Sequence, residues 1–232
     1  MQLPYFYEPT ITQTSSFILS EETSKHCIQV LRIKEGELIN LTDGKGNLYT
    51  AQIKQADKKH CVANILSNQY NSMQQRIVSL AVSLTKNNSR FEWLLEKATE
   101  IGVSEIIPLL CKRTEKQHFR FERMNNILIS AMLQSKQTWL PVLQEPTTFQ
   151  ATVQSSSYQQ KLIAHCIENE KTSVTDLSLL NNIQILIGPE GDFTEEEILL
   201  AQKHSYLPVT LGCTRLRTET AGMVAATLLI NC

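Results

Sequence analysis

The sequence predicts an α/β fold in two parts, a small β-rich module followed by a larger domain with a mostly parallel sheet. Short alternating segments fill the first seventy residues, as is typical of strands with one buried face. From residue 76 onward, apolar strand-like runs alternate with amphipathic helical segments. This order gives a parallel sheet covered by helices on both faces. A chain of 232 residues is long enough for one large or two small domains.

A β-hairpin is the clearest feature of the first module, which we assign to residues 1–70. Residues 38–42 and 48–53 alternate between apolar and polar side chains, as strands with one buried face do. The segment between them, residues 43–47, contains two glycines in a run of polar residues and therefore predicts the turn. Residues 60–66 form a further strand candidate.

A short helix is expected before the hairpin and a linker after the module. Ser20 is a good helix N-cap, and the helix that it starts can run to about Leu31. Residues 68–75 are mostly polar and carry no hydrophobic pattern, which is typical of a connecting segment. We assign residues 71–75 to the linker and residues 76–232 to the second domain.

The second domain alternates strands with helices along its whole length. Its apolar strand candidates are residues 77–84, 106–110, 161–164, 183–187 and 209–211. Its helix candidates are residues 90–101, 121–136, 194–204 and 218–230. Gly102 stands where a left-handed residue commonly ends a helix. Thr194 precedes three glutamates that suit the positive end of a helix dipole.

Composition excludes several classes of protein. Hydrophobic residues make up 42% and charged residues 19% of the chain, which is ordinary for a soluble globular protein. No apolar run is long enough to span a bilayer, and residues 1–10 do not resemble a signal peptide, so a cytoplasmic location is expected. The six cysteines are scattered without close Cys or His partners, which predicts free, buried thiols and no metal site. We assign no role to Cys232.

The net charge of −1 hides a local basic excess. Residues 76–145 carry ten basic and seven acidic side chains, whereas residues 146–232 carry five basic and nine acidic. The basic excess is greatest at Lys112, Arg113, Lys116, Arg120 and Arg123. Such a patch can hold phosphates. Because Glu115 and Glu122 are interleaved, a solvated surface is the alternative, and the patch alone favours that alternative.

Two loops in the last fifty residues are the candidates for chemistry. The chain has neither a G-x-G-x-x-G motif after a strand nor a P-loop. Instead, the strand 183–187 leads directly into Gly188-Pro189-Glu190-Gly191, at the strand end where ligands bind in open α/β sheets. The glycines let the backbone approach a ligand closely. An ordinary strand-to-helix turn without a ligand is the alternative.

Residues 211–222 repeat this arrangement, because they follow the last strand and open the last helix. Arg217 can hold a phosphate or carboxylate, and Glu219 near a helix start tends to stay ionised. If Thr218 only caps the helix and Arg217 only lies at the surface, the loop holds no ligand. Two such loops, close in sequence and both at strand ends, favour a ligand site.

Together the two loops resemble the RsmE family of RNA methyltransferases. The matching segments are Ile187 to Gly191, Leu211-Gly212 and Leu216-Arg217-Thr218-Glu219-Thr220-Ala221. Further matches lie at Lys86, Glu92, residues 97–103 (KATEIGV), Gln134-Ser135 and Pro141. In the first module, His26, residues 30–32, Gly36 and the turn at 43–46 are similar to the family's RNA-binding domain. The resemblance therefore covers almost the whole chain.

Members of that family methylate N3 of a uridine in the 16S rRNA of the small ribosomal subunit, with S-adenosylmethionine as the methyl donor. The resemblance implies a PUA-like β-barrel followed by a SPOUT methyltransferase domain whose C-terminal chain forms a trefoil knot, an exception to the usual unknotted topology. It also implies a homodimer that needs no metal ion and no membrane.

The resemblance also assigns roles to residues. It places the cofactor against Leu186, Ile187, Gly188, Glu190, Gly191, Leu211, Gly212, Leu216, Arg217, Thr220 and Ala221, with the three leucines beside the adenine. We expect Arg217 to stabilise the uracil oxygens or orient the methionine carboxylate, and Glu219 or Glu190 to handle the N3 proton. A purely structural role in its loop is the alternative for either glutamate. RNA is expected to contact Arg32, Lys86, Lys112, Arg113, Arg120 and Arg123.

A few positions depart from the family pattern. Leu133 stands where the family often has an acidic residue, Gln137 where it often has arginine, and Asp192 in place of a second glycine. The first strand has Tyr5 and Tyr7 but no arginine. Either tyrosine can stack on a base or pack in the core. These departures leave the fold assignment intact and bear on individual RNA contacts.

Two alternative functions stay open at the level of sequence. One is another SPOUT enzyme that methylates transfer RNA or a ribose hydroxyl. The other is a non-catalytic RNA-binding or ribosome-assembly factor that has kept the fold. Gly188, Glu190, Arg217 and Glu219, which a dead factor need not retain, speak against the second.

Overall fold

The chain forms two compact units in the computed structural model, which describes residues 3–12, 15–115, 117–168 and 170–231. The first unit comprises Met1–Met73 together with Met132–Leu140, and the second comprises Gln74–Ala131 and Pro141–Cys232. Residues 132–140, which the sequence analysis placed in the second domain, therefore pack with the first unit. The Trp139 indole donates to the carbonyl oxygen of Asn71, and Gly46 N donates to that of Thr138.

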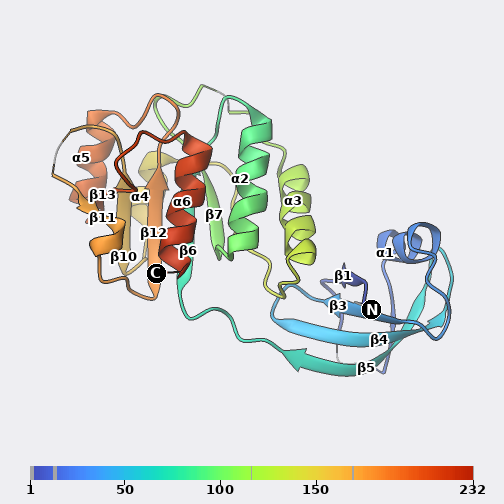
Figure 1. Cartoon of the computed structure of the whole chain (residues 1–232). Helices are drawn as coiled ribbons and strands as arrows, with labels where there is room; N and C mark the ends of the chain where they lie inside the picture. Colours follow the sequence, from blue (N-terminus) through green and yellow to red (C-terminus); the bar gives the residue numbers. More distant parts are fainter. Residues whose placement is uncertain (1–2, 13–14, 116, 169, 232) are drawn as a thin grey trace. The chain divides into compact units, whose positions relative to one another are not determined.

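A five-stranded half-barrel sheet builds the first unit (Figure 1). Its order is β1-β3-β4-β5-β2. The strands are β1 (Tyr5–Tyr7), β2 (Ser16–Ile18), β3 (Leu38–Thr42), β4 (Asn47–Gln55) and β5 (Val62–Tyr70). The expected hairpin is confirmed, because β3 and β4 pair antiparallel from Leu38 opposite Gln52 to Thr42 opposite Leu48. The pairing of β4 with β5 reaches Tyr70, so residues 68–70 belong to a strand and not to the polar connection that their composition suggested.

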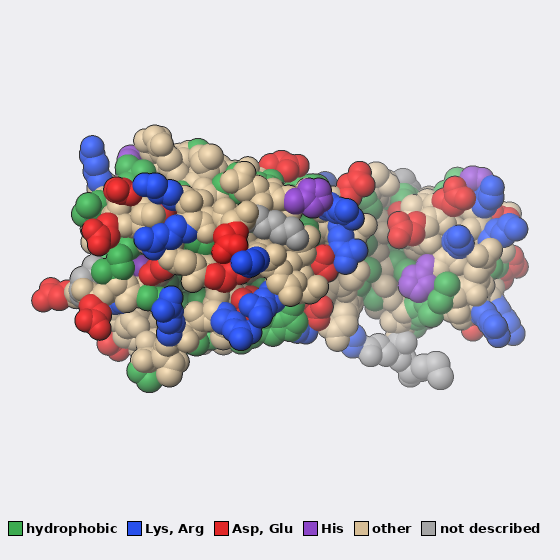
Figure 2. All heavy atoms as spheres, turned by 90° about the horizontal axis from the view of Figure 1, so that it is seen from above, with side chains coloured by type: hydrophobic (Ala, Val, Ile, Leu, Met, Phe, Trp, Pro, Cys, Tyr) green, Lys and Arg blue, Asp and Glu red, His purple; other side chains and the backbone are tan. Residues whose placement is uncertain are grey.

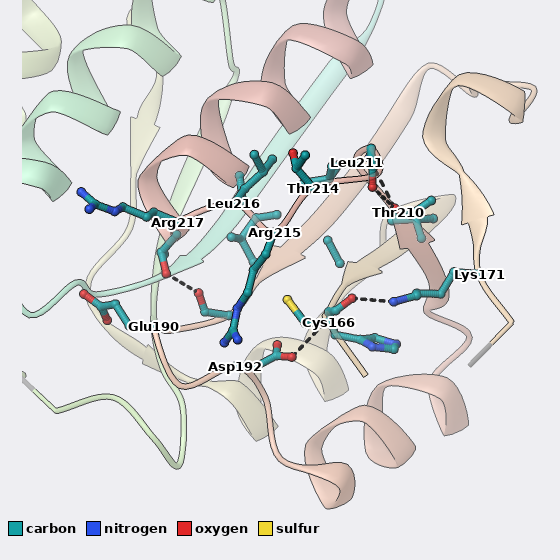
Figure 3. A pocket seen from close by; sticks show the side chains of 18 of the residues that line it. Cys166, Lys171, Glu190, Asp192, Thr210, Leu211, Thr214, Arg215, Leu216 and Arg217 are labelled. Carbon is teal, nitrogen blue, oxygen red and sulfur yellow. Dashed lines mark hydrogen bonds between the residues drawn. The ribbon is translucent and has the colours of Figure 1, made fainter. Parts of the chain in front are cut away.

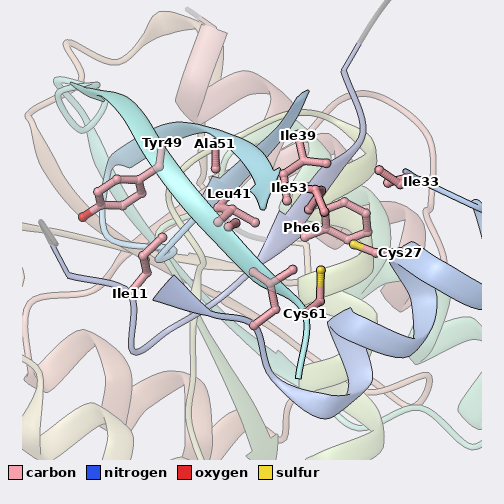
Figure 4. Packing of buried hydrophobic residues seen from close by; sticks show 12 residues of the cluster. Phe6, Ile11, Cys27, Ile33, Ile39, Leu41, Tyr49, Ala51, Ile53 and Cys61 are labelled. Carbon is pink, nitrogen blue, oxygen red and sulfur yellow. The ribbon is translucent and has the colours of Figure 1, made fainter. Parts of the chain in front are cut away.

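One hydrophobic cluster fills this unit (Figure 4). Phe6, Ile39, Leu41 and Ile53 are among its almost fully buried members. The helix α1 (Glu21–Lys25) begins at Ser20, whose hydroxyl accepts a hydrogen bond from Thr23 N, as predicted. It continues as one turn of π-helix, η1 (His26–Val30).

The two N-terminal tyrosines pack within the first unit. The Tyr5 hydroxyl donates a 3.0 Å hydrogen bond to the carbonyl oxygen of Gln137. The Tyr7 ring lies so close to Gly44 that a Cβ there would come within 2.9 Å of it. Burial raises the pKa of both phenols. Both tyrosines therefore have a structural role in this part of the chain.

A parallel sheet of eight strands forms the second unit. Its order is β11-β13-β10-β12-β6-β7-β8, with β9 also beside β7. The strands are β6 (Ile77–Ser83), β7 (Glu105–Leu110), β8 (Val142–Leu143), β9 (Thr147–Thr148), β10 (Gln160–Ala164), β11 (Thr172–Ser173), β12 (Asn182–Ile187) and β13 (Leu207–Thr210). Every described pairing in this sheet is parallel, which confirms the predicted α/β class.

Helices cover both faces of that sheet. The helical segments after β6 are α2 (Asn88–Ile101), α3 (Phe121–Gln134), α4 (Phe149–Ser155), the 3-10 turn η2 (Val174–Asp176), α5 (Glu195–Lys203) and α6 (Thr218–Asn231). α6 packs against α2 and over β6 and β12 (Figure 1). α4 and α5 contribute to a core with Ala81, Ile163 and Leu186. Because side chains alternate along a strand, Leu80 and Ile185 face the opposite side, where they are also fully buried.

Several short elements were not predicted. They are β2, β8, β9, β11, η2 and α4, which span only two to seven residues. Such elements show too little periodicity to be recognised in a sequence. Gly102 ends α2 with a φ of 104°, in the left-handed conformation expected of it.

Candidate active site

Three neighbouring strands end around one cavity of about 550 Å³. They are β13, β10 and β12, which lie side by side in the sheet in an order that differs from their order in the chain. The cavity lies at their carboxyl ends, the place where open α/β sheets bind ligands. Its walls come from Ala164–Cys166, from the two loops that the sequence analysis selected, and from the start of α6 (Figure 3).

A tight turn and a capped helix N-terminus define the conformation of the loop after β12. Asp192 N donates to the carbonyl oxygen of Pro189 at 2.9 Å. Thr194 then caps α5, and its backbone N–H donates in return to the Glu197 carboxylate, a reciprocal capping box. The cap fixes where the helix begins, so the preceding residues lie outside the helix, and Gly188, Pro189, Glu190 and Asp192 line the cavity.

Asp192 explains one departure from the family pattern. Its φ is 63°, a left-handed conformation that glycine adopts freely and that Asp and Asn tolerate better than other residues. Its carboxylate accepts hydrogen bonds from Cys166 N and Phe193 N, both at 2.8 Å. The side chain thereby ties the loop after β12 to the loop after β10, which a glycine could not do.

The second loop is joined to the first at the entry to α6. The Thr218 hydroxyl donates a 3.0 Å hydrogen bond to the carbonyl oxygen of Gly188 and is buried. Ala221 N donates to the carbonyl oxygen of Arg217 at 2.7 Å and starts the helix. Residues 212–215 are exposed and form the outer wall of the cavity.

Sequence reasoning missed the third wall, which follows β10. Ala164, His165, Cys166 and Lys171 all line the cavity. A usable signal was present, because residues 161–164 were predicted to be a buried strand of the same sheet. Its carboxyl end therefore had to lie at the same edge as those of the other two strands.

His165 is the most unusual residue of that wall. Its side chain is only 7% exposed, and neither ring nitrogen has a hydrogen-bond partner among the residues that the structure describes. Burial lowers the pKa of its imidazole, and the ammonium of Lys171 lowers it further, whereas Asp192 opposes them. The imidazole is therefore neutral near pH 7, with one nitrogen as donor and the other as acceptor.

Of the three charged residues expected to take part in catalysis, two line the cavity and one does not. Glu190 and Arg217 both line the cavity. One Glu190 carboxylate oxygen accepts a 2.9 Å hydrogen bond from Lys86 N. Glu219 is not among the lining residues. Its buried carboxylate lies in the first turn of α6, 3.6 Å from the guanidinium of Arg90.

Most of the expected cofactor contacts lie on the cavity wall. They are Ile187, Gly188, Glu190, Leu211, Gly212, Leu216, Arg217 and Ala221. Leu186, Gly191 and Thr220 are not among the lining residues. Leu186 is fully buried in the core beneath α4 and α5. Gly191 lies against the side chain of Arg113.

Intramolecular ion pairs occupy several of the cations expected to bind RNA. Lys86 pairs with Glu115 at 2.7 Å, Lys112 with Glu196 at 3.0 Å, and Arg123 with Glu92 through two hydrogen bonds of 2.7 and 3.0 Å. Figure 2 shows basic and acidic side chains interspersed on the face that it views. The acidic partners reduce the positive potential that these cations present to a phosphate.

The remaining cations differ from one another. Arg113 donates to the carbonyl oxygens of Gly191 and Phe193, so it supports the loop after β12. Arg120 donates to the His118 imidazole and is exposed. Arg32, in the first unit, is exposed and has a φ of 55°. Lys116 lies outside the described residues.

The cysteines only partly follow the prediction of free, buried thiols. Cys27, Cys61 and Cys111 are free and buried. Cys166 and Cys213 are free but exposed, because each lies in a loop beyond a strand end and not within the sheet. Cys232 lies outside the described residues.

A metal cluster and a membrane-spanning helix are both absent from the described residues. No three or more of their His, Cys, Asp and Glu side chains are grouped so that they could hold a metal ion. No described helix combines the length and apolarity needed to cross a membrane.

Family models match both units of the chain. A model for an RNA methyltransferase domain matches residues 72–230, and a model for an RNA methyltransferase PUA domain matches residues 19–66. Ribosomal RNA small subunit methyltransferase E from Synechocystis is 31% identical over 227 residues, which cover 94% of this chain and 72% of that protein. The chain belongs to the ribosomal RNA small subunit methyltransferase E family.

Solved structures of similar proteins agree with this assignment to the methyltransferase E family. A probable rRNA methyltransferase from Porphyromonas gingivalis is 35% identical with a TM-score of 0.91, and the match covers 98% of both chains. A ribosomal RNA small subunit methyltransferase E from Neisseria gonorrhoeae, bound to S-adenosylmethionine, is 30% identical with a TM-score of 0.88. That match covers 97% of this chain and 95% of the other. The α/β fold with an N-terminal PUA domain is thus the fold of the family.

Proposed function

We propose that this protein is an S-adenosylmethionine-dependent methyltransferase that modifies N3 of a uridine in 16S rRNA. Membership of the methyltransferase E family supports the reaction class and the ribosomal RNA substrate. The single structural observation that carries the proposal is the cavity at the ends of β10, β12 and β13, where both family loops meet. The choice of N3 rests on the resemblance of those loops alone.

The cavity has the size and chemistry that adenosylmethionine requires. Its volume of about 550 Å³ lies within the range usual for cofactor sites. Ile187, Leu211, Leu216 and Ala221 supply apolar surface for an adenine. The charged residues Glu190, Arg215 and Arg217 also line it, so polar groups of a ligand have hydrogen-bonding sites to meet.

The bound cofactor would supply a methyl group already activated by its sulfonium charge. The protein must then position the uracil and remove the N3 proton, because the protonated nitrogen is a poor nucleophile. We assign proton removal to Glu190, whose carboxylate lines the cavity and is held by Lys86 N. Arg217, on the opposite loop, would stabilise the negative charge that develops on the uracil oxygens.

Glu219 fits an indirect role better. It lies in the first turn of α6 beside Arg90, and its second carboxylate oxygen is buried without a partner among the described residues. We therefore propose that Glu219 fixes the start of α6, from which Arg217 and Thr218 reach the cavity. This changes the expectation that either glutamate could serve as the base.

The test compares ribosomal RNA from cells with and without the gene. Loss of N3-methyluridine from 16S rRNA on deletion, and its return on complementation, is the expected result in nucleoside mass spectrometry. Complementation with Glu190→Gln or Arg217→Ala should restore little methylation, although both purified variants should bind adenosylmethionine in calorimetry. Near-normal methylation by both variants would contradict the catalytic assignment, and an unchanged 16S rRNA on deletion would contradict the function.

The same experiment separates the alternatives. A SPOUT enzyme for transfer RNA or for a ribose hydroxyl would leave 16S N3-methyluridine intact and remove a different modified nucleoside. A non-catalytic assembly factor would change no nucleoside, and it need not bind adenosylmethionine.

Further proposals concern the assembly of the protein. We propose a homodimer that acts in the cytoplasm on the small ribosomal subunit, with the domain boundary at residues 71–75 and a trefoil knot formed by the chain between β12 and α6. Arg32 and the basic segment from Lys112 to Arg123 would contact RNA phosphates. RNA binding that does not weaken with added salt would contradict those contacts, and sedimentation as a monomer at micromolar concentration would contradict the dimer.

A further inference from the structure

We propose that Tyr70, Trp139 and Lys45 form a surface that binds an unpaired nucleotide of single-stranded RNA, with the base stacked on the Tyr70 ring. All three residues belong to the first unit. The proposal rests on the proposed function, because it takes the methylated RNA as the partner. It gives a task to residues that belong neither to the cavity nor to the basic segment of the second unit.

The first step is that Tyr70 is exposed on a side of the sheet that is buried elsewhere. Tyr70 lies opposite Asn47, and Asn68 lies opposite Tyr49, so these four side chains point to the same side. Tyr49 is 3% exposed and belongs to the hydrophobic cluster of the unit, whereas Tyr70, the last residue of β5, is 62% exposed. The core-facing side therefore ends in an aromatic residue that is accessible to another molecule.

The second step is that the ring is held in a fixed place. Trp139 packs against it edge to face, with 6.1 Å between the ring centroids and 79° between the planes. The Trp139 indole donates a 2.9 Å hydrogen bond to the carbonyl oxygen of Asn71. Gly46 lies against both rings, and a Cβ there would come within 2.8 Å of each. An aromatic pair that is ordered in advance loses little conformational entropy when a base stacks on it.

The third step concerns charge. Lys45 forms a β-bridge with Trp139, so the two side chains lie on the same side. Lys45 is exposed, and its ammonium has no hydrogen bond or ion pair among the described residues. The neighbouring Asp43 carboxylate is buried and accepts hydrogen bonds from Lys45 N, Asn47 N and Asn47 Nδ2. The Lys45 charge is thus available, unlike the charges of the paired cations in the second unit.

These features fit RNA with unpaired nucleotides. An accessible aromatic ring can stack on any base, and an ammonium beside it can meet the phosphate. Asn68 carries an exposed amide on the same side as Tyr70, and an amide can both donate to and accept from the edge of a base. In a duplex the bases stack on one another and are not accessible to Tyr70. The surface therefore favours a single strand over a helix.

The test is a fluorescence titration of the full-length protein with a short oligouridylate. Trp93 and Trp139 are the two tryptophans of the chain, so Trp93→Phe leaves Trp139 as the only indole that reports. In that parent protein, Tyr70→Leu removes the aromatic ring but keeps apolar contact, and Tyr70→Phe keeps the ring. Lys45→Gln removes the charge. Thermal unfolding gives the stability of each variant.

Two control variants change the other end of the same sheet. Lys58→Ala removes an exposed lysine beyond the far end of β4, a strand whose nine residues span about 30 Å. Ile18→Ala removes an exposed apolar side chain opposite Val62, at the start of β5. Both should give the titration of the parent protein.

We expect oligouridylate to quench Trp139 and to bind Tyr70→Leu about tenfold more weakly than the parent, because one stacking partner is lost. Tyr70→Phe should stay within about twofold of the parent, since the ring remains. Lys45→Gln should reduce the log–log slope of affinity against salt by about 0.7, the value for one phosphate contact with a single strand.

Other results overturn the inference. Absence of Trp139 quenching, or equal affinity of Tyr70→Leu and Tyr70→Phe, would show that no base stacks on this surface. Stronger binding of an RNA duplex of the same length would reject the preference for unpaired nucleotides. If Tyr70→Leu fails to fold, the quenching in the parent protein and the salt slope of Lys45→Gln decide.

Failure of this inference and failure of the proposed function give different results. N3-methyluridine that depends on the gene, together with an unquenched Trp139, rejects the surface alone. N3-methyluridine that does not depend on the gene, together with a quenched Trp139, rejects the proposed function alone.

Discussion

The Thr218 hydroxyl donates a buried 3.0 Å hydrogen bond to the carbonyl oxygen of Gly188, across 30 positions of the chain. This bond connects the first residue of α6 to the first residue after β12. The first loop of the candidate active site begins at Gly188, and the second ends at Thr218. This one hydroxyl group therefore links the two loops directly.

Replacing Thr218 by valine should separate the two loops with little change in side-chain shape. A buried carbonyl oxygen loses its partner, so we expect the free energy of unfolding to fall by about 1–3 kcal/mol. The affinity for S-adenosylhomocysteine should fall as well. Thr227→Val is the matched control, because Thr227 donates to Met223 O on the exposed side of the same helix. Equal effects of both substitutions in denaturation and calorimetry would contradict a special role for Thr218.

Arg120 and Arg123 should contribute unequally to RNA binding. The Arg123 guanidinium makes two hydrogen bonds to Glu92 and holds the pKa of that carboxyl below its usual value. Arg120 donates to a histidine and is exposed. We expect Arg120→Ala to weaken binding to a 16S rRNA fragment and to reduce its salt dependence, by about one unit in the log–log slope. Arg123→Ala should change both less, and the reverse order would reject this interpretation.

Ligand binding should protect two thiols from alkylation. Cys166 and Cys213 are exposed and line the cavity from different loops. N-ethylmaleimide should modify both in the free protein and react more slowly when S-adenosylhomocysteine is bound, as read from peptide masses. Cys27 and Cys111 serve as internal controls, because burial raises the pKa of each thiol to about 12 and suppresses the reactive thiolate. Saturating ligand without protection at either site would place the ligand elsewhere.

The stability of the protein should depend on pH through His165. Its pKa in the folded state is lowered by burial and by Lys171, whereas an unfolded histidine titrates near a pKa of about 6.5. Above that value neither state binds the proton. As the pH falls through it, the unfolded state binds the proton first, so the folded state loses stability.

His165→Phe should remove this contribution. The melting temperature of the wild type relative to that of the variant should therefore decrease between pH 7.5 and pH 5.5. The other histidines are common to both proteins and cancel in the difference. A constant difference across this range would mean that the imidazole titrates normally in the folded protein.

Periodicity predicted the long elements of the fold well. The capping residues Ser20 and Thr194 and the left-handed Gly102 each acted at the predicted place, because these signals depend on a few neighbouring residues. The packing of residues 132–140 with the first unit was missed. It depends on contacts such as that of Trp139 with Asn71, 68 positions apart, which no local pattern reveals.

Of the three chain segments that line the candidate cavity, two were selected from the sequence. The loops at Gly188 and Leu211 carry glycine signals and a family motif, so the sequence was sufficient to select them. His165 has neither signal, and its burial without a hydrogen-bond partner among the described residues is a property that only coordinates can show. The same holds for Glu219, whose distance from the cavity wall could not be foreseen from its position within the motif.

The strand order also determines when the cavity can exist. Every residue that lines it lies between Ala164 and Ala221, and β6 pairs with β12 about a hundred positions later, as the contact of Ser79 with Gln184 illustrates. During synthesis, β6 can pair early with β7, but its other edge must wait until β12 leaves the ribosome. Co-translational folding can thus complete the first sheet early, whereas the cofactor site appears only after most of the second unit has emerged.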